Sequence, residues 1–408
     1  MSYNLINREQ YMKRIRPFIE SDLIKVLTGM RRSGKSVMLE LIKKELILRG
    51  VSKDKIISIN FESLNYYDLC NAFSLHEKIQ KCINDSKEKY YLFFDEIQEV
   101  KDWEKAINSF RVEFNCDIYV TGSNAKLLSS ELATYLAGRY VEFIIYPFSY
   151  AEFLTLYKLE NPLSEEELIF STYLTLGGMP YLSNLRYKEE PSYQYLLDLF
   201  NSVILKDVVK RNNIRDVDLL ERIITYVLAN IGNTFSATSI SKYFKNEKRI
   251  VAPETILNYL KACEEAFLFY KVKRQDIKGK QLLSVNEKYY VSDLGIREAV
   301  LRGNLKDINL SLENIVYMEL LRRGYSVTVG KLGDKEIDFI ATRQEEKIYL
   351  QVTYLLSSEE TIKREFGIYD GVKDNYPKFV ISLDKFNMSQ NGIKHYNLKK
   401  FLLMESWN

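Results

Sequence analysis

An α/β fold is predicted for this chain, and its first 150 residues carry the main observations that predict it. Five apolar segments, rich in β-branched or aromatic residues, alternate there with helical patterns; they span residues 23–28, 55–61, 90–94, 117–121 and 140–146. Such alternation is typical of a parallel sheet with helices on both faces. The full length of 408 residues exceeds that of one compact domain and favours two to four domains.

The first predicted strand leads directly into residues 29–36, which read Gly-Met-Arg-Arg-Ser-Gly-Lys-Ser. This octapeptide fits the phosphate-binding pattern G-x-x-x-x-G-K-[ST] at every fixed position. A helical repeat of Leu and Ile follows it, from Val37 to Leu48. In such a loop the backbone N–H groups converge on phosphate oxygens, and the start of the helix adds the positive end of its dipole. The alternative, a glycine-containing turn with a chance lysine, is disfavoured by the flanking elements.

We therefore expect the loop to bind ATP with Mg²⁺. Lys35 would reach the β- and γ-phosphates, and the Ser36 hydroxyl would bind the metal. The residues expected to contact the nucleotide are Gly29, Met30, Arg31, Arg32, Ser33, Gly34, Lys35, Ser36 and Val37.

Two adjacent carboxylates, Asp95 and Glu96, follow the apolar run from Tyr90 to Phe94. A strand buried on both faces would place Asp95 at its carboxyl end, where ligands bind in open α/β sheets. Asp95 is expected to bind Mg²⁺, and Glu96 to orient or deprotonate the attacking water. Alone, the pair could simply end a strand at the surface; together with the loop it predicts a site that hydrolyses a nucleotide.

A polar tip, Ser123-Asn124, ends the next predicted strand. In ATPases with a glutamate beside the Walker B aspartate, a strand lies between the phosphate-loop strand and the Walker B strand, and its tip senses the γ-phosphate. Ser123 or Asn124 would serve in this way. A turn followed by the N-cap of a helix over 125–132 is an equally good interpretation and is compatible with sensing.

Further short motifs follow in order: Thr121-Gly122-Ser123, Gly138-Arg139, Pro147 to Phe153, and Gly177-Gly178-Met179-Pro180. With the phosphate loop and Asp95-Glu96, they resemble the prokaryotic AAA-like ATPases related to the STAND class. Relatives of those ATPases carry a C-terminal domain of unknown function related to restriction-endonuclease-like folds. The resemblance covers nearly the whole chain. It implies a P-loop NTPase with an ASCE-type parallel sheet and a C-terminal α/β nuclease-like domain. Helical and hairpin patterns between them predict a helical lid and a winged helix.

The resemblance also assigns roles to three arginines. Arg139 would be the arginine finger or sensor, acting in its own subunit or in a neighbour, because phosphoryl transfer needs positive charge at the γ-phosphate. Arg31 and Arg32 would be the usual basic pair of the loop. The alternative for all three is solvent-facing charge.

We expect four domains: a P-loop ATPase domain at 1–153, a helical lid or linker at 154–214, a winged helix at 215–300 and a nuclease-like domain at 301–408. The lid rests on helical patterns at 165–176 and 193–210. The winged helix rests on helices at 235–243 and 252–269, followed by strands at 269–272 and 289–291.

Charge on the winged helix gives conflicting signals. Its second helix should be basic or polar if it enters a major groove, but it carries Glu254, Glu264 and Glu265 against Lys261. The predicted wing is basic, with Lys271, Lys273, Arg274, Lys278 and Lys280. A contact with the nucleotide domain or with a protein partner is therefore favoured over DNA.

The nuclease-like domain contains a second group of acidic residues. In the fold that it resembles, a helix Glu, a strand Asp and an E-x-K on the next strand hold Mg²⁺ and activate water. Glu313 and Asp338 match the first two, but the third reads Gln351-Val352-Thr353. Gln351 lowers the ligand charge, and Thr353 removes the cation that polarises water. Lys347 is an alternative cation, although such a lysine more often starts a strand. We expect a degenerate module that does not cleave DNA.

Composition narrows the remaining possibilities. The 58 basic and 55 acidic residues leave a net charge of +3, which does not indicate a nucleic-acid binder. The 4 cysteines form no C-x-x-C pair and only 2 histidines occur, so zinc clusters and histidine-based triads are poorly supplied. The N-terminal segment lacks the apolar core of a signal peptide, and no run reaches membrane-spanning length. We expect a soluble, cytoplasmic protein without a membrane partner.

These observations favour a Mg²⁺-dependent ATPase whose hydrolysis drives or gates rearrangement of the C-terminal domains. Lys35, Glu96, Arg139 and Ser123 are its candidate catalytic residues. DNA or a protein is a possible partner, and a homo-oligomer is a possible assembly. The alternatives are a nucleotide-gated regulatory or DNA-binding adaptor with negligible turnover and, least favoured, an ATP-controlled nuclease.

Overall fold

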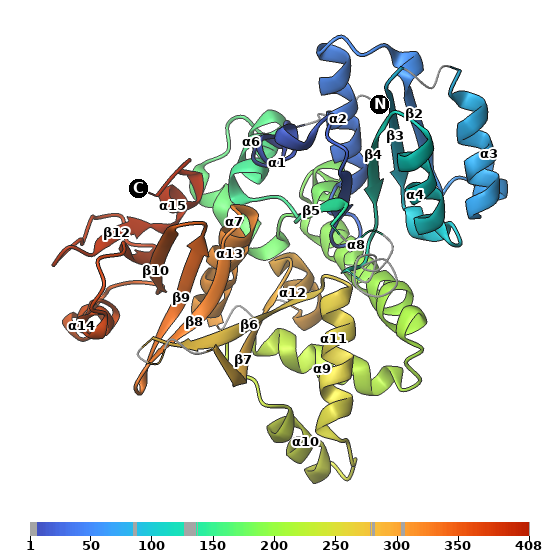
Figure 1. Ribbon diagram of the computed structural model, residues 1–408. Helices are drawn as coiled ribbons and strands as arrows, with labels where there is room; N and C mark the ends of the chain where they lie inside the picture. Colours follow the sequence, from blue (N-terminus) through green and yellow to red (C-terminus); the bar gives the residue numbers. More distant parts are fainter. Residues whose placement is uncertain are drawn as a thin grey trace. The chain divides into compact units, whose positions relative to one another are not determined.

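The computed structural model describes residues 6–84, 88–125, 136, 138–277, 279, 282–302 and 307–407, without the side chains of 282–286. It divides into two compact units (Figure 1). Unit 1 comprises Met1–Pro147 and Glu265–Phe267, and unit 2 comprises Phe148–Glu264 and Leu268–Asn408. Among the helices in the described ranges, none has both the length and the apolar character that crossing a bilayer requires.

Unit 1 contains the predicted parallel sheet. Its strands are β1 (Ile24–Thr28), β2 (Ile56–Asn60), β3 (Tyr90–Asp95), β4 (Cys116–Thr121) and β5 (Tyr140–Ile144). They lie in the order β2-β3-β4-β1-β5, and every pair is parallel (Figure 1). The predicted fold class is confirmed, and β4 lies between the phosphate-loop strand and the strand that ends in Asp95.

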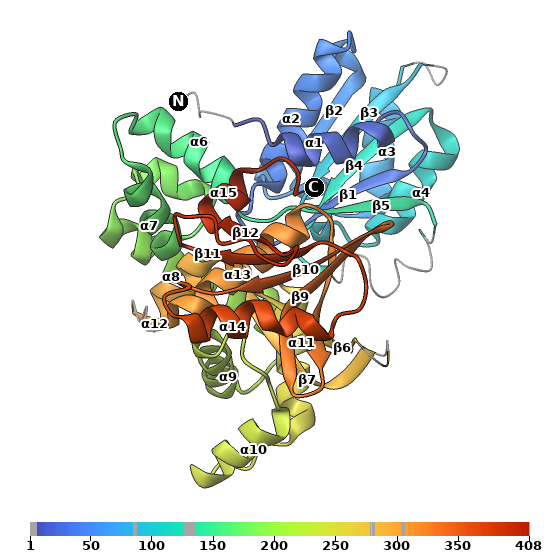
Figure 2. The same ribbon diagram turned by 90° about the vertical axis from the view of Figure 1, so that its left-hand side faces the viewer.

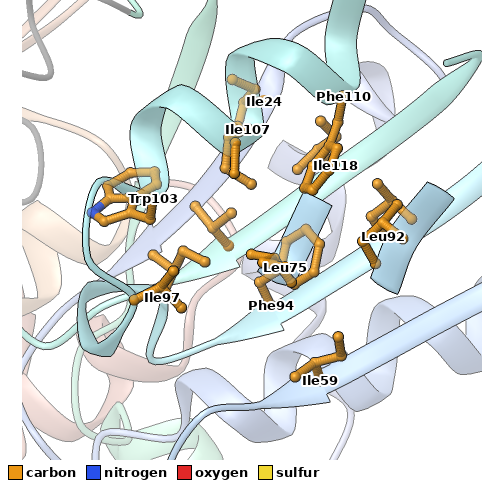
Figure 3. Close-up of a cluster of buried hydrophobic side chains, with 14 of the residues drawn as sticks. Ile24, Ile59, Leu75, Leu92, Phe94, Ile97, Trp103, Ile107, Phe110 and Ile118 are labelled. Carbon is orange, nitrogen blue, oxygen red and sulfur yellow. The ribbon is translucent and has the colours of Figure 1, made fainter. Parts of the chain in front are cut away.

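The helices of unit 1 are α1 (Glu9–Ile15), α2 (Lys35–Leu48), α3 (Ala72–Cys82) and α4 (Trp103–Glu113). Alternate side chains of the strands, such as Leu92 and Phe94 of β3 and Ile118 of β4, pack with Ile107 and Phe110 of α4 in one buried cluster (Figure 3). Full burial of such a side chain contributes about 1.5–3 kcal/mol. This packing fixes the sheet, and with it the ends of the strands that carry polar residues.

The helices of unit 2 confirm the predicted helical segments and add others. They are α6 (Tyr150–Glu160), α7 (Glu166–Leu176), α8 (Glu189–Ser202), α9 (Val217–Ala229), α10 (Ala237–Asn246), α11 (Pro253–Glu265), α12 (Leu294–Leu301), α13 (Ile308–Arg322), α14 (Glu359–Gly367) and α15 (Leu398–Leu403). The segment predicted at 193–210 starts earlier, and its last part, Val203–Lys210, is π-helical. Ser149 begins α6 with a capping box that involves Glu152, which explains part of the Pro147 to Phe153 motif.

A seven-stranded mixed sheet forms the centre of unit 2. Its strands are β6 (Phe269–Asp276), β7 (Leu282–Val291), β8 (Ser326–Leu332), β9 (Lys335–Arg343), β10 (Glu346–Val352), β11 (Lys378–Ser382) and β12 (Lys394–Asn397), in the order β12-β11-β10-β9-β8-β6-β7. The strands predicted as a wing, β6 and β7, form an antiparallel pair, and β6 also pairs with β8. The predicted division between residues 300 and 301 therefore separates strands that belong to one sheet.

Two helices cover opposite faces of this sheet. Phe339 of β9 contacts Tyr317 of α13, with ring centroids 5.9 Å apart. Its neighbour Ile340 belongs instead to the cluster that includes Phe366 of α14. Adjacent strand residues point to opposite faces, so α13 and α14 lie on different sides of β9 (Figure 2).

The Gly177-Gly178 motif forms a tight joint inside unit 2. Gly177 has φ +72°, and a Cβ there would lie 2.0 Å from Asp293 Oδ1. A Cβ on Gly178 would lie 2.3 Å from the Phe148 carbonyl oxygen. The Gly178 N–H donates to Asp293 Oδ2 at 2.7 Å, and the Phe148 N–H donates to the Gly178 carbonyl at 2.8 Å. This part of the motif is explained by close packing.

Candidate functional site

The phosphate loop joins β1 to α2 as the sequence predicts. Gly29 has φ +135°, and a Cβ there would lie 2.3 Å from the Ile145 carbonyl oxygen, so no larger residue fits. Gly34 is the N-cap of α2 in a left-handed conformation, and the helix begins at Lys35. The first N–H groups of a helix have no acceptor within it, so α2 presents donors and its positive dipole end at the loop.

Lys35 lies at the centre of the loop and is 4 % exposed. Its Nζ donates to the carbonyl oxygens of Gly29 and Met30 at 3.1 and 3.2 Å, and it lies 3.8 Å from Glu96 Oε1. The structure therefore brings together the predicted phosphate-binding lysine and the predicted water-activating glutamate, which are far apart in the sequence.

Asp95 and Glu96 are held by residues at the ends of the two neighbouring strands. Asn60 Nδ2 donates to Asp95 Oδ2 at 3.1 Å, and Thr121 Oγ1 donates to Asp95 Oδ1 at 2.5 Å. The Thr121 hydroxyl also accepts from the Glu96 N–H at 2.9 Å. No role in the site was predicted for Asn60 or Thr121, although each is the last residue of a strand beside β3.

An open pocket lies beside these residues. It is lined by Ser36, Val37, Leu39, Glu40, Ser58, Asn60 and Asp95. The Ser36 hydroxyl and the Asp95 carboxylate supply oxygen, the donor that Mg²⁺ prefers alongside substrate phosphates and water. In the described ranges no group of three or more His, Cys, Asp or Glu side chains could hold a metal.

The remaining loop residues are partly accessible. Arg31 Nη1 lies 3.6 Å from Glu62 Oε1, and Arg32 is exposed with φ 67°. Met30 is buried, while Val37 is 38 % exposed. The Ser33 hydroxyl is buried and has no hydrogen-bond partner in the part of the chain that the structure describes. Such a group suits a loop whose remaining partner is a ligand.

Ser123 and Asn124 are buried directly after β4, on the strand end that β4 shares with the phosphate loop. The structure therefore places both near the edge where the predicted sensor belongs. The helix expected over 125–132 falls almost wholly outside the described residues.

Arg139 lies at the other end of the sheet. Tyr140, which follows it, pairs with Ile24 at the start of β1, whereas the phosphate loop follows Thr28 at the end of β1. The four residue steps between them span about 13 Å. Arg139 is exposed, and its Nη1 donates to Asn108 Oδ1 at 2.9 Å. Within one chain, the structure does not bring Arg139 to Lys35 and Glu96.

The acidic residues predicted in unit 2 also come together, around a lysine that the sequence analysis missed. Lys288 of β7 lies with its Nζ 3.9 Å from Glu313 Oε2 and 2.6 Å from Glu336 Oε1. Tyr290 OH donates to Glu313 Oε2 at 3.2 Å. The Asp338 carboxylate accepts from the Val352 N–H at 2.7 Å. We refer to Lys288, Glu313, Glu336 and Asp338 as the carboxylate cluster.

Ionisation in the carboxylate cluster is dominated by burial. Burial raises the pKa of Glu313 to about 7, although Lys288 opposes this shift. Burial and the charge of Glu313 raise the pKa of Asp338. Burial disfavours the charged form of Lys288, but Glu313, Asp338 and Glu336 outweigh it and raise the pKa of the lysine. The raised pKa values of Glu313 and Asp338 and the positive charge of Lys288 together reduce the net negative charge that the cluster buries.

The other residues of the predicted nuclease motif have structural contacts. Gln351 Oε1 accepts from the Asp338 N–H at 3.2 Å, and the Thr353 N–H donates to the Ile381 carbonyl at 2.9 Å. Lys347 Nζ lies 3.3 Å from Asp374 Oδ2. Lys347 is thus engaged by Asp374, and the cation of the carboxylate cluster is Lys288.

Ser382, Asp384 and His395 have the residue types of a hydrolase triad, but the serine, not the histidine, is the middle member of their hydrogen-bond chain. His395 Nδ1 accepts from the Met388 N–H at 3.2 Å, so Nε2 carries the hydrogen and donates to Ser382 Oγ at 2.8 Å. The serine in turn donates to Asp384 Oδ2 at 2.7 Å. No base accepts the serine proton from the histidine side, so the trio is structural.

Two family models match parts of this chain. Residues 21–154 match the model of an AAA domain, and residues 167–307 match a domain of unknown function (DUF8612). With the fold and the phosphate loop, this match identifies residues 21–154 as an AAA-like P-loop domain.

Among solved structures, Aeropyrum pernix ORC1 in complex with DNA aligns with a TM-score of 0.30 and 11% identity over 74% of this chain and 93% of that chain. AMPPCP-bound DnaA from Aquifex aeolicus aligns with a TM-score of 0.29 and 14% identity, over 64% of this chain and 90% of that chain.

Two relatives match along almost the whole chain. An uncharacterized protein of Haemophilus influenzae is 40% identical over 405 residues, covering 99% of this chain and 100% of its own length. The uncharacterized protein MJ1544 of Methanocaldococcus jannaschii is 30% identical over 398 residues, covering 94% and 84%. The chain belongs to the same family as these two proteins.

Proposed function

We propose that the chain binds ATP with Mg²⁺ and hydrolyses it, and that the reaction drives or gates rearrangement of unit 2. One observation carries the proposal. Lys35 and Glu96 meet at 3.8 Å at the carboxyl ends of β1 and β3, beside a pocket lined by Ser36 and Asp95. This set combines phosphate binding, metal binding and water activation at one edge of the sheet.

Each residue has a defined task in this proposal. Lys35 and the N–H groups that open α2 bind the β- and γ-phosphates. Ser36 and Asp95 would hold Mg²⁺, which when bound neutralises charge on the phosphate oxygens. Glu96 orients the attacking water and accepts its proton. Ser123 senses the γ-phosphate from the end of β4.

Arg139 acts, in this proposal, on a neighbouring copy of the chain. Its place at the start of β5, about 13 Å from the phosphate-loop end of β1, supports this because it is out of reach of its own site. A homo-oligomer is then part of the proposed function. Measuring mass and ATPase rate together, with and without ATP, tests it: an ATPase that stays monomeric at full rate would contradict a role for Arg139 in a neighbour.

Two variants test the ATPase proposal. Lys35→Ala is expected to lose ATP binding, and Glu96→Gln to bind ATP without hydrolysing it. Binding titrations and steady-state phosphate release, measured on the full chain with Mg²⁺, give both answers. The proposal fails if Lys35→Ala binds ATP as wild type does, or if Glu96→Gln hydrolyses it undiminished.

A second candidate is a nucleotide-gated adaptor with negligible turnover. The observation that favours it is the contact of Glu96 Oε1 with Lys35 at 3.8 Å, because it engages the carboxylate that hydrolysis would need. Steady-state ATPase rates with and without duplex DNA separate the candidates. Turnover that DNA does not raise above background would favour the adaptor.

A protein partner is favoured over DNA for the winged-helix region. Arg274, one of the predicted wing cations, is bound within unit 2 by Glu336 at 2.9 Å, and Lys271 lies 3.7 Å from Glu287. Lys278 and Lys280 fall outside the described residues. Replacing the five wing cations by Ser and measuring duplex binding over a salt series tests this; a lower affinity with a shallower salt slope would favour DNA.

We also propose that residues 301–408 form a nuclease-like domain that does not cleave DNA. Gln351 and Thr353 stand where the motif has its Glu and Lys, and Lys288 Nζ lies 3.9 Å from Glu313 Oε2. Purified protein is expected not to nick plasmid with Mg²⁺ or Mn²⁺. Nicking that is lost in Asp338→Ala would contradict this.

We also propose a cytoplasmic location. The described structure contains Cys70, Cys82, Cys116 and Cys263 as free thiols, which suits a reducing compartment. Fractionation of cells that express the tagged chain tests this.

A further inference from the structure

Gln98 lies in the short 3₁₀ turn Ile97–Glu99 that follows β3. This turn folds the chain back, so that Gln98 Nε2 donates a hydrogen bond to Glu96 Oε2. Glu96 itself is left-handed, with φ 54° and ψ 50°, a conformation that few residues other than glycine adopt. The Thr121 hydroxyl holds its N–H at 2.9 Å. Backbone and side chain of Glu96 are thus both fixed by hydrogen bonds.

The two carboxylate oxygens of Glu96 face different partners. Oε1 faces the Lys35 ammonium at 3.8 Å, toward the phosphate loop, and Oε2 accepts from Gln98. A lysine in a phosphate loop turns to the phosphates when they bind. That movement would release Oε1, while Oε2 keeps its bond to the neutral amide.

The Gln98 amide has no other hydrogen bond in the part of the chain that the structure describes. Its Oε1 is buried without a partner, so Glu96 is the group that determines which way the amide points. Burying an unpaired acceptor is unfavourable, and an apolar side chain of the same length would fill this space without that cost. A packing role therefore does not explain an amide here; a bond to Glu96 does.

We propose that Gln98 is a positioning residue for ATP hydrolysis, which anchors Glu96 Oε2 so that Oε1 is the oxygen presented to the attacking water. In the step that it serves, the water oxygen bonds to the γ-phosphorus and its proton passes to Glu96 Oε1. The bond from the γ-phosphorus to the bridging oxygen breaks, and ADP and inorganic phosphate are released. The inference rests on the proposed ATPase function and adds a residue to it.

The test uses Gln98→Met in the full chain, because Met has nearly the length of Gln and cannot donate the bond. We expect the Kd for ATP to stay within about twofold of wild type and kcat to fall about tenfold. Gln80→Met, on the exposed side of α3, is the matched control and is expected to keep both values. A kcat for Gln98→Met equal to that of the control would overturn the proposal.

A double-mutant cycle separates positioning from general damage. In the Glu96→Gln background the anchored base is absent, so Gln98→Met should lower the single-turnover rate no further. Losses that multiply would overturn the proposal, because they would show that Gln98 acts independently of Glu96. If Gln98→Met does not fold, Gln98→Glu replaces it: its carboxylate repels Glu96 and must show the same non-additive loss.

This cycle also distinguishes failure of the inference from failure of the proposed function. Undiminished hydrolysis by Glu96→Gln would remove the ATPase assignment itself. Impaired Glu96→Gln with unimpaired Gln98→Met would leave the ATPase assignment in place and remove only the role of Gln98.

Discussion

The phosphate site of unit 1 and the carboxylate cluster of unit 2 are built from the same types of residue. In unit 1, Lys35 lies beside Glu96 and near Asp95; in unit 2, Lys288 lies beside Glu313 and near Asp338. In each unit, these residues lie on or directly after different helices and strands. Yet Asp95 lines an open pocket beside Ser36, whereas Glu313 and Glu336 both face the buried Lys288, at 3.9 and 2.6 Å.

This difference teaches that residue types alone do not make a functional site. At the carboxyl ends of parallel strands, loop N–H groups and an exposed hydroxyl remain available to a ligand. Inside unit 2, Lys288 pairs with Glu313 and Glu336, and burial raises the pKa of Glu313 and of Asp338. The comparison therefore predicts that Lys35 matters chiefly for ligand binding and Lys288 chiefly for stability.

The largest expected effect is on stability, from Lys288→Met. Removing this cation leaves the buried carboxylates Glu313 and Asp338 uncompensated, which should lower the free energy of unfolding of unit 2 by about 3–5 kcal/mol. Denaturant unfolding measures this. Lys271→Met is the control, since Lys271 is an exposed residue of β6 whose loss should cost at most about 1 kcal/mol. Equal stability of the two variants would break the comparison.

The next effect is on ligand affinity, from Lys35→Ala. Loss of this ammonium should weaken ATP binding by about 100-fold, or about 2.7 kcal/mol, with little change in thermal stability. Calorimetric titration and thermal unfolding give both values. Lys44→Ala, an exposed position of the same helix α2, should bind ATP normally. A variant at position 35 that unfolds easily but still binds ATP would reverse the roles of the two lysines.

Thr121→Val should have a moderate effect on turnover. It removes the hydroxyl that bonds both Asp95 and the Glu96 N–H, and kcat should fall about tenfold while the protein stays folded. Thr121→Ser keeps the hydroxyl and should retain most of the activity. Equal rates for the Val and Ser variants would show that these hydrogen bonds do not support the phosphate site.

The smallest effect concerns Asp293, a buried carboxylate of unit 2. Burial raises its pKa to about 6, although the Gly178 and Gly295 N–H groups and Arg322 oppose the shift. Since this folded-state pKa lies above the unfolded value, its contribution to stability is present at low pH and is lost as pH rises through about 6.

Asp293→Asn cannot ionise, so it isolates this contribution. As the pH rises from 4.5 to 6.5, the Tm of wild type should fall by about 2–4 °C relative to the Tm of Asp293→Asn. Thermal unfolding at three pH values measures the difference. A Tm difference that does not change with pH would show that Asp293 is not the buried titrating group described above.

Local features of unit 1 could be predicted from the sequence. The strands were visible as short apolar runs, and the phosphate loop and Asp95-Glu96 are contiguous patterns with fixed chemistry. The first predicted strand contains a charged residue, Lys25. The fold accommodates it because the Lys25 ammonium is buried in an ion pair with the Asp117 carboxylate of β4.

The features that could not be predicted from the sequence depend on pairing between strands that are distant in the chain. Asn60 and Thr121 reach Asp95 only because β2 and β4 both flank β3. Lys288 enters the carboxylate cluster because β6 pairs with β8, which joins the β6-β7 hairpin to the C-terminal sheet. The distance of Arg139 from the phosphate loop follows from the register of β5 on β1. No local pattern specifies strand order or register.

The most direct test of the central claim is ATP hydrolysis by Glu96→Gln. This variant keeps the size of the side chain and the hydrogen-bonding capacity of one oxygen but cannot take a proton from water. We predict that it binds ATP with wild-type affinity and hydrolyses it at least about 100-fold more slowly. Hydrolysis at the wild-type rate would contradict the assignment of this strand end as a hydrolytic site.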